Sequence, residues 1–195
     1  MALKRANDWE GMDVTCLPPE LHNRPKRIPE SVANAIREAR QTHSRIFVAY
    51  ADCGTGGMLD RVLEAEGIER LPGAHCYEFY ATSAEFMALH DAEPGTFYLT
   101  DFLVRHYERL VTVGLGIDRH PQLAREYFRH YRRVVYLVQA ADAGLSAQAA
   151  GIAARLGLEY EERRTGFGEM ATSLADVMHR AGVEMVIEPP RSVRG

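Results

Sequence analysis

Hydrophobic residues along the chain gather in short runs that alternate with longer amphipathic stretches. The clearest short runs cover 46–50, 96–99, 134–138 and 183–187, and residues 158–163 are a weaker candidate. Short runs that are apolar on both faces are typical of buried parallel strands. We therefore expect strands over these runs.

In the stretches between these runs, apolar residues recur every three or four positions, which is the spacing of an amphipathic helix. The expected helices cover about 29–41, 58–66, 83–90, 101–113, 118–131, 146–157 and 169–181. Strands that alternate with helices predict parallel strands joined by right-handed crossovers. The expected fold class is α/β, with a mainly parallel Rossmann-like sheet, helices on both of its faces, and room for two or three similar α/β units.

The length of 195 residues predicts a single domain over 1–195, with 1–11 as a loose arm and 189–195 as a tail. A net charge of -4 gives no basic footprint for nucleic acid. No apolar run approaches the roughly 20 residues of a membrane span, and the N-terminus lacks the apolar segment of a signal peptide. We expect a cytoplasmic protein that binds neither nucleic acid nor membrane.

The three cysteines are odd in number and form no CxxC pair, so reduced thiols are expected rather than a disulfide framework. All three lie in loop-like settings beside polar or turn residues. Thiolates together with imidazole are ligands of zinc and of iron–sulfur clusters. The predicted metal ligands are Cys16, Cys53, Cys76 and His22, with His75 and Glu78 as alternatives to the histidine.

A glycine-rich turn follows the first apolar run and precedes a helix, the arrangement that opens a βαβ unit. Such a turn offers backbone amides to an anion or nucleotide, although its glycines do not match G-x-G-x-x-G. The residues predicted to bind a cofactor are Asp52, Gly54, Thr55, Gly56, Gly57, Arg24, Arg119 and His120. The residues predicted to act in acid–base catalysis are His75, Glu78, Asp101 and His106.

Six motifs occur together along the chain. They are Cys-x-Pro-Pro-x-Leu-His-Asn-Arg-Pro (16–25), Asp-Cys-Gly-Thr-Gly-Gly (52–57), His-Cys-Tyr-Glu-Phe (75–79), Pro-Gly-Thr-Phe-Tyr-Leu-Thr-Asp-Phe-Leu (94–103), Gly-Leu-Gly-Ile-Asp-Arg-His-Pro (114–121) and Arg-Arg-Thr-Gly-Phe-Gly (163–168). In these motifs the chain resembles the domain-of-unknown-function family 1638 over nearly its whole length. The resemblance implies a genomic neighbourhood, because members are often encoded near corrinoid-dependent methyltransferases of the trimethylamine type and their corrinoid proteins.

Three functions follow from these observations. The first is a metal-dependent enzyme or accessory factor in corrinoid-linked methyl transfer or one-carbon metabolism, with a zinc ion or an iron–sulfur cluster. The second is a binding module without chemistry that docks on a corrinoid protein or a methyltransferase. The third is a small-molecule transferase that uses the loop 52–57 as an anion or nucleotide cradle.

Overall fold

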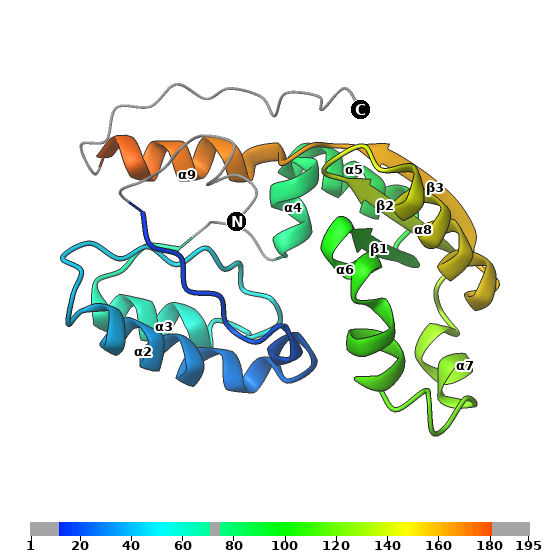
Figure 1. Ribbon diagram of the computed structural model, residues 1–195, viewed down its shortest axis with the longest axis horizontal. Coiled ribbons are helices and arrows are strands. Elements are labelled where there is room, and N and C mark those ends of the chain that lie inside the picture. The colour runs from blue at the N-terminus through cyan, green and yellow to red at the C-terminus, as the bar shows by residue number, and fades with distance from the viewer. Residues whose placement is uncertain (1–11, 71–74, 181–195) are drawn as a thin grey trace.

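The computed structural model of the protein describes residues 12–70 and 75–180. Two short 3-10 helices, η1 and η2, precede the longer helices, and η3 is a π-helix. The elements in chain order are η1 (Pro19–Asn23), η2 (Pro25–Arg27), α2 (Ile28–Ala39), α3 (Met58–Glu66), α4 (Cys76–Ala81), α5 (Ser83–Ala92), β1 (Thr96–Thr100), α6 (Asp101–Arg105), η3 (Glu108–Val113), α7 (Leu123–Phe128), β2 (Arg133–Val138), α8 (Ala143–Leu156), β3 (Glu159–Arg164) and α9 (Gly168–Arg180). Figure 1 shows their arrangement.

A parallel sheet of three strands, in the order β1-β2-β3, organises the second half of the described chain. Leu99 of β1 is opposite Tyr136 of β2, which in turn is opposite Glu162 of β3. The α/β class and the predicted strands 96–99, 134–138 and 158–163 are confirmed. The predicted strand 183–187 lies outside the described residues, and the expectation of repeated α/β units stays a prediction.

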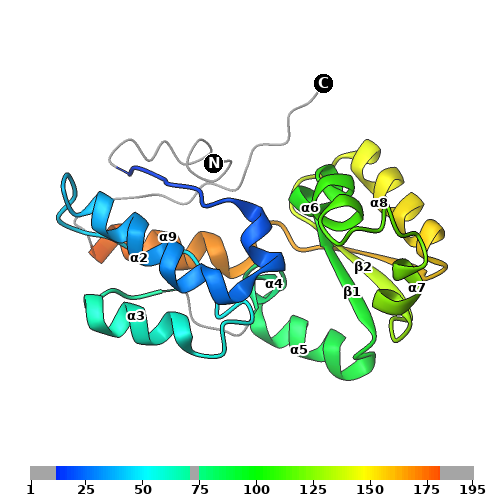
Figure 2. The same cartoon turned by 90° about the horizontal axis from the view of Figure 1, so that it is seen from below.

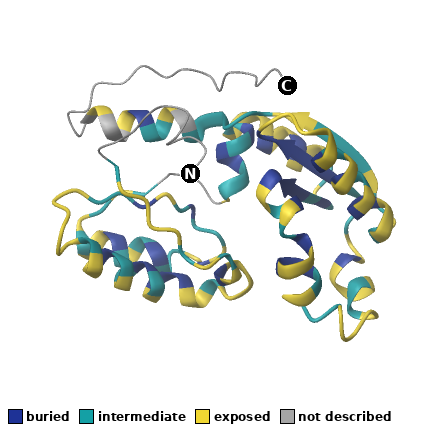
Figure 3. Cartoon of the chain, in the orientation of Figure 1, coloured by how far each residue is buried: buried dark blue, intermediate teal, exposed yellow. Residues whose placement is uncertain are grey.

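The central strand β2 is buried on both faces, as Figure 3 shows. One face, with Val134 and Tyr136, packs against residues of η3 and α8. The other face, with Val135 and Leu137, packs against residues of α4 and α5. Alternating side chains of a strand point to opposite faces of a sheet, so this strand needs apolar residues at every position. The run of apolar residues in the sequence reflects that double burial.

The predicted strand 46–50 is wrong for the described residues, among which this segment joins no ladder of the sheet. Only Val48 forms an isolated parallel bridge, with Arg70, and its amide donates to the carbonyl of Glu69 at 3.2 Å. Its apolar residues pack under α2 and α3 instead, in a cluster that includes Ile36 and Leu59. The apolar run was therefore a sign of burial beneath helices rather than of strand pairing.

Several helix ends differ from their predicted positions. The expected loop 75–78 contains the first turn of α4, whose N-cap is His75. Thr82 caps α5, and Asp142 caps α8 by accepting from the amides of Gly144 and Leu145, so α8 begins before the predicted position 146. Helix boundaries depend on which side chain reaches the unpaired amides, and two polar residues near one start compete for that role.

No helix in the described ranges combines the length and apolar character that a membrane crossing requires.

Two close contacts attach the N-terminal helices and α4 to the rest of the molecule. The side-chain amide of Asn23 in η1 donates to the carbonyl of Leu110 in η3 at 3.0 Å. Helix α9 leaves β3 and extends past α4 to the side of α2 and α3 (Figure 2). At its start, a Cβ on Gly168 would overlap the backbone of Phe79 and Tyr80. The contact at Gly168 leaves no room for a side chain.

Replacing Gly168 by alanine is expected to destabilise the protein by at least about 2 kcal/mol. Its φ is +48°, in the left-handed region, and an added Cβ would meet backbone atoms of α4. Gly151 in α8 is the matched control, since a Cβ there meets no atom within 4 Å. Gly151→Ala should stabilise the protein by about 0.5–1 kcal/mol through helix propensity. Urea denaturation measures both, and equal effects would contradict the close α4–α9 contact.

Candidate functional site

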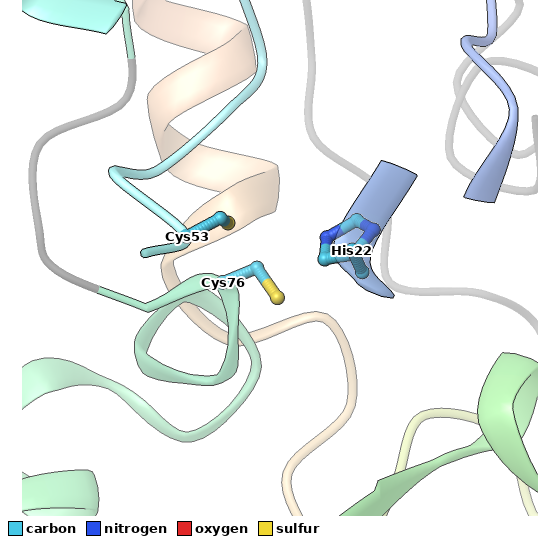
Figure 4. A group of neighbouring side chains, drawn as sticks. All are labelled: His22, Cys53 and Cys76. Atoms are coloured by element: carbon cyan, nitrogen blue, oxygen red, sulfur yellow. The ribbon is translucent and has the colours of Figure 1, made fainter. Parts of the chain in front are cut away.

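Three predicted ligands from separate elements meet in space. His22 comes from η1, Cys53 from the glycine-rich loop before α3, and Cys76 from the first turn of α4. One ligand atom from each lies within 4.8 Å of the other two. In Figure 4 the two cysteine side chains lie together, facing the ring of His22. A Cys₂His group is thus assembled by the fold from residues 31 and 23 positions apart.

The position of Cys53 is set by the Asp52 carboxylate. This carboxylate accepts from the Thr55 hydroxyl at 2.6 Å and from the amides of Gly56 and Gly57 at 3.1 and 2.9 Å. Burial alone would raise the pKa of Asp52, but these hydrogen bonds outweigh it and lower the pKa to about 2. The turn closed in this way holds Cys53 at a φ of +47°. Non-glycine residues rarely adopt this conformation, and they concentrate at functional sites.

Cys76 is held by the cap of a short helix. The Glu78 carboxylate accepts from the amide of His75 at 3.2 Å, and the pair forms a capping box at the start of α4. The Ser83 hydroxyl donates to the other oxygen of Glu78 at 3.3 Å. Cys76 itself packs at the edge of an apolar cluster that contains Phe79. His75 and Glu78, which were predicted to be catalytic, thus form the helix cap next to Cys76. Neither belongs to the Cys₂His group.

His22 is exposed, yet its ring has fixed neighbours. The ring stacks on that of Tyr50, with centroids 5.7 Å apart and an angle of 19° between the planes. Its Nδ1 lies 3.3 Å from the carbonyl oxygen of Pro19. The next residue, Asn23, bonds to Leu110, which attaches η1 to η3. The imidazole is therefore oriented before any ligand arrives.

Electrostatics within the group favour a thiolate at Cys53. The pKa of the Cys53 thiol falls to about 5, chiefly because the Cys76 thiol donates a hydrogen bond to it. Burial of Cys53 acts against this decrease, and a hydrogen bond from His22 adds to it. The same interactions act in reverse on the partners. Donating to Cys53 raises the pKa of Cys76 well above its ordinary value and also raises that of His22. A negative sulfur is thus ready to accept either a proton or a cation.

The donor set fits a single soft metal ion. With Zn–S of about 2.3 Å and Zn–N of about 2.0–2.1 Å, a tetrahedral site places its donors about 3.5–3.8 Å apart. The observed donors, all within 4.8 Å of one another, are close to that spacing. Cysteine sulfurs on one cubane cluster are up to about 7 Å apart. The three donors therefore fit a mononuclear centre better than a cluster.

Cys16 does not join the group. It is exposed on the segment before η1, and the described donors that converge are His22, Cys53 and Cys76 alone. The loop 52–57, predicted to bind an anion, already uses its amides within the chain, because those of Gly56 and Gly57 donate to the Asp52 carboxylate. Thr55 is buried, and its hydroxyl also serves Asp52. Arg24, another predicted cofactor-binding residue, is exposed between η1 and η2.

Asp101 has a full set of partners at the carboxyl ends of β1 and β2. It accepts from the Tyr136 hydroxyl at 2.8 Å and from the amides of Gln139 and Ala140, each at 3.0 Å. Its own amide donates to the Gln139 side chain at 2.7 Å. The carboxylate is buried and joins two strand ends, so the structure gives it a positioning role that the sequence did not reveal.

The remaining predicted residues lie elsewhere. His106 caps the end of α6, with its ring 4.6 Å from that of Phe102. Arg119 and His120 are exposed in the turn before α7, where Arg119 lies 3.9 Å from Asp118. Figure 1 shows this end of the molecule well away from α4. These three residues are not brought to the Cys₂His group.

Two contributors to the site escaped the sequence reasoning. Tyr50 ends an apolar run and looked like a strand residue, but its ring supports His22. Burial and the nearby Cys53 and Cys76 raise the pKa of Tyr50 to about 12, so its hydroxyl stays protonated. Asn23 sits beside His22 in the motif 16–25, and only its tertiary contact reveals that it anchors η1. Adjacency to His22 was the one signal available for Asn23, and Tyr50 gave none.

The fold and the group define an α/β protein with a parallel sheet and a candidate Cys₂His metal centre. The chain belongs to the DUF1638 family, described as a protein of unknown function, whose match covers residues 16–174. That range contains all three members of the group. Neither the curated proteins nor the solved structures yield a match to this chain.

Replacing Asp101 by asparagine tests its positioning role. The variant keeps the side-chain volume but turns an amide NH₂ toward backbone donors and loses the charged acceptor. We expect a loss of about 1–3 kcal/mol in the free energy of unfolding. Asp91→Asn, at an exposed position of α5, is the matched control and should change little. An Asp101→Asn variant as stable as the wild type in urea would contradict this role.

Proposed function

We propose that the protein holds one zinc ion at His22, Cys53 and Cys76 and acts as a metal-dependent enzyme or accessory factor. The observation that carries this proposal is the convergence of the three donors within 4.8 Å of one another. Two thiolates and one imidazole are a donor set that zinc uses in catalytic sites with an open fourth position. The negative charge favoured at Cys53 supports cation binding at the same place.

Zinc accounts for the spacing of the donors better than an iron–sulfur cluster does. A cubane is usually held by four cysteines, and the group contains two, with Cys16 exposed outside it. A structural zinc site is closed by four protein ligands, whereas a three-ligand site leaves a position for substrate. The donor count therefore supports a role in chemistry rather than in stability alone.

The reaction class comes from the family resemblance and is part of the proposal. A zinc ion acts as a Lewis acid on whatever occupies its open position. In corrinoid-linked methyl transfer or one-carbon metabolism, this would activate a methyl donor or acceptor, with the corrinoid protein or methyltransferase as partner. The residues of this chain supply the rest: Tyr50 orients the imidazole, and Asp52 holds the loop of Cys53.

The other two functions have less support. An anion or nucleotide cradle at 52–57 would need amides that the Asp52 carboxylate already uses. If the protein were a binding module without chemistry, neither the low pKa of Cys53 nor the convergence of His22, Cys53 and Cys76 would serve its function. Both make the same prediction about metal, namely that none is retained.

Metal content and stability of the wild type and Cys53→Ser test the proposal. Wild-type protein should bind one equivalent of zinc, and free zinc at about 100 times Kd should stabilise it by about 2.7 kcal/mol. For a chain of this size that corresponds to about 5–11 °C in melting temperature. Serine is a harder donor that deprotonates far less readily, so zinc affinity should fall by more than about 100-fold.

Cys16→Ser is the matched control, since Cys16 is exposed and outside the group. It should retain zinc and respond to a chelator as the wild type does. The chelator should lower the melting temperature of the wild type and leave Cys53→Ser nearly unchanged. A wild type that binds no zinc, or a Cys53→Ser variant that retains it fully, would refute the proposed centre. Iron and sulfide in anaerobically purified protein would favour a cluster instead.

A further inference from the structure

No further cysteine or histidine of the chain is placed to complete the centre of His22, Cys53 and Cys76. All eight histidines and all three cysteines of the sequence lie within the described residues, and only these three converge. The residues outside the described ranges contain neither cysteine nor histidine. Because zinc takes four ligands, a fourth ligand that is a thiolate or an imidazole must come from another molecule.

The position of the group allows such a molecule to reach it. His22 is exposed, whereas Cys53 and Cys76 are half-buried, so solvent reaches the group at its histidine. Around the sulfurs the neighbours are mostly apolar. Tyr50 stacks on the imidazole, and Phe79 belongs to the cluster around Cys76. Aromatic rings therefore contribute to the packing on both the histidine side and the cysteine side of the group.

The charge of the centre selects the kind of ligand. Two thiolates cancel the two charges of the metal, and the imidazole adds none, so the centre is neutral and polarises water less than a centre of neutral ligands does. Soft donors match soft metals, and a further thiolate extends the same set.

We infer that the open position takes the sulfur of a small-molecule thiol, bound as a thiolate. This inference rests on the proposed metal centre and names the class of its substrate. On binding, the R–S–H bond breaks, the sulfur keeps the electron pair and bonds to the metal, and the proton leaves to solvent. A metal-bound thiol loses its proton near neutral pH, so the site holds a thiol in its nucleophilic form. No oxidant or reductant takes part.

Cobalt(II) in place of zinc makes this binding visible. Protein prepared without thiol reductants and loaded with cobalt should show sulfur-to-cobalt charge-transfer absorption from two thiolates. Adding 2-mercaptoethanol should raise that absorption about 1.5-fold, from two Co–S bonds to three. Ethylene glycol, which carries oxygen in place of that sulfur, is the matched control and should leave the absorption unchanged. The Cys16→Ser variant should show the same rise as the wild type.

The outcomes separate this inference from the proposed centre. If the protein binds no cobalt and no zinc, the metal centre fails, and the inference fails with it. If cobalt binds but 2-mercaptoethanol adds no charge-transfer intensity, the centre stands and the inference is overturned. Absorption from three thiolates before any thiol is added, reduced in Cys16→Ser, also overturns it, because the exposed Cys16 of a second copy would then be the fourth ligand.

Discussion

The hydrogen bonds of the Asp52 carboxylate are the interaction on which the site depends. One side chain collects a hydroxyl and two backbone amides and closes the turn that carries Cys53. In that turn Cys53 takes a left-handed conformation that a free chain would avoid. Without this closure the sulfur would have no fixed direction. The same carboxylate uses the amides that would otherwise attract an anion, which directs the loop toward presenting a thiol.

The other two donors are positioned by contacts with the sheet half of the molecule. Asn23 joins η1 to the π-helix η3, and Gly168 lets α9 lie directly on the backbone of α4. Cys76 therefore takes its place from α4, whereas His22 and Cys53 belong to the helical half with α2 and α3, which the Asn23 bond joins to the sheet half. The Cys₂His group lies where these two halves meet. Its geometry is a property of the whole fold rather than of a local motif.

The sequence predicted the central strand of the sheet well, because a strand buried on both faces appears in the sequence as an uninterrupted apolar run. The run 134–138 must be apolar at every position, and it is the central strand β2. The run 46–50 is also apolar at every position but packs under helices, and an apolar run by itself does not distinguish the two kinds of burial. Strand pairing is a tertiary property, so only the placement of a partner strand could have separated them.

The candidate ligands were predicted from residue type and setting, and their selection required the structure. Cys53, Cys76 and His22 converge, while Cys16, with an equally suggestive sequence setting, is exposed outside the group. Asp101 carried the residue type of a catalytic acid, yet it bonds two strand ends. Long sequence separations hide which donors meet, because convergence depends on packing between elements. Tyr50 was hidden for the same reason, since aromatic support for a ligand leaves no local pattern.

A crystal structure of protein grown with zinc, with diffraction recorded on both sides of the zinc absorption edge, tests the central claim most directly. The account predicts one anomalous peak per chain, about 2.3 Å from the sulfurs of Cys53 and Cys76 and about 2.0–2.1 Å from a ring nitrogen of His22. The absence of a peak at this group, or a peak bound by other residues, would contradict it.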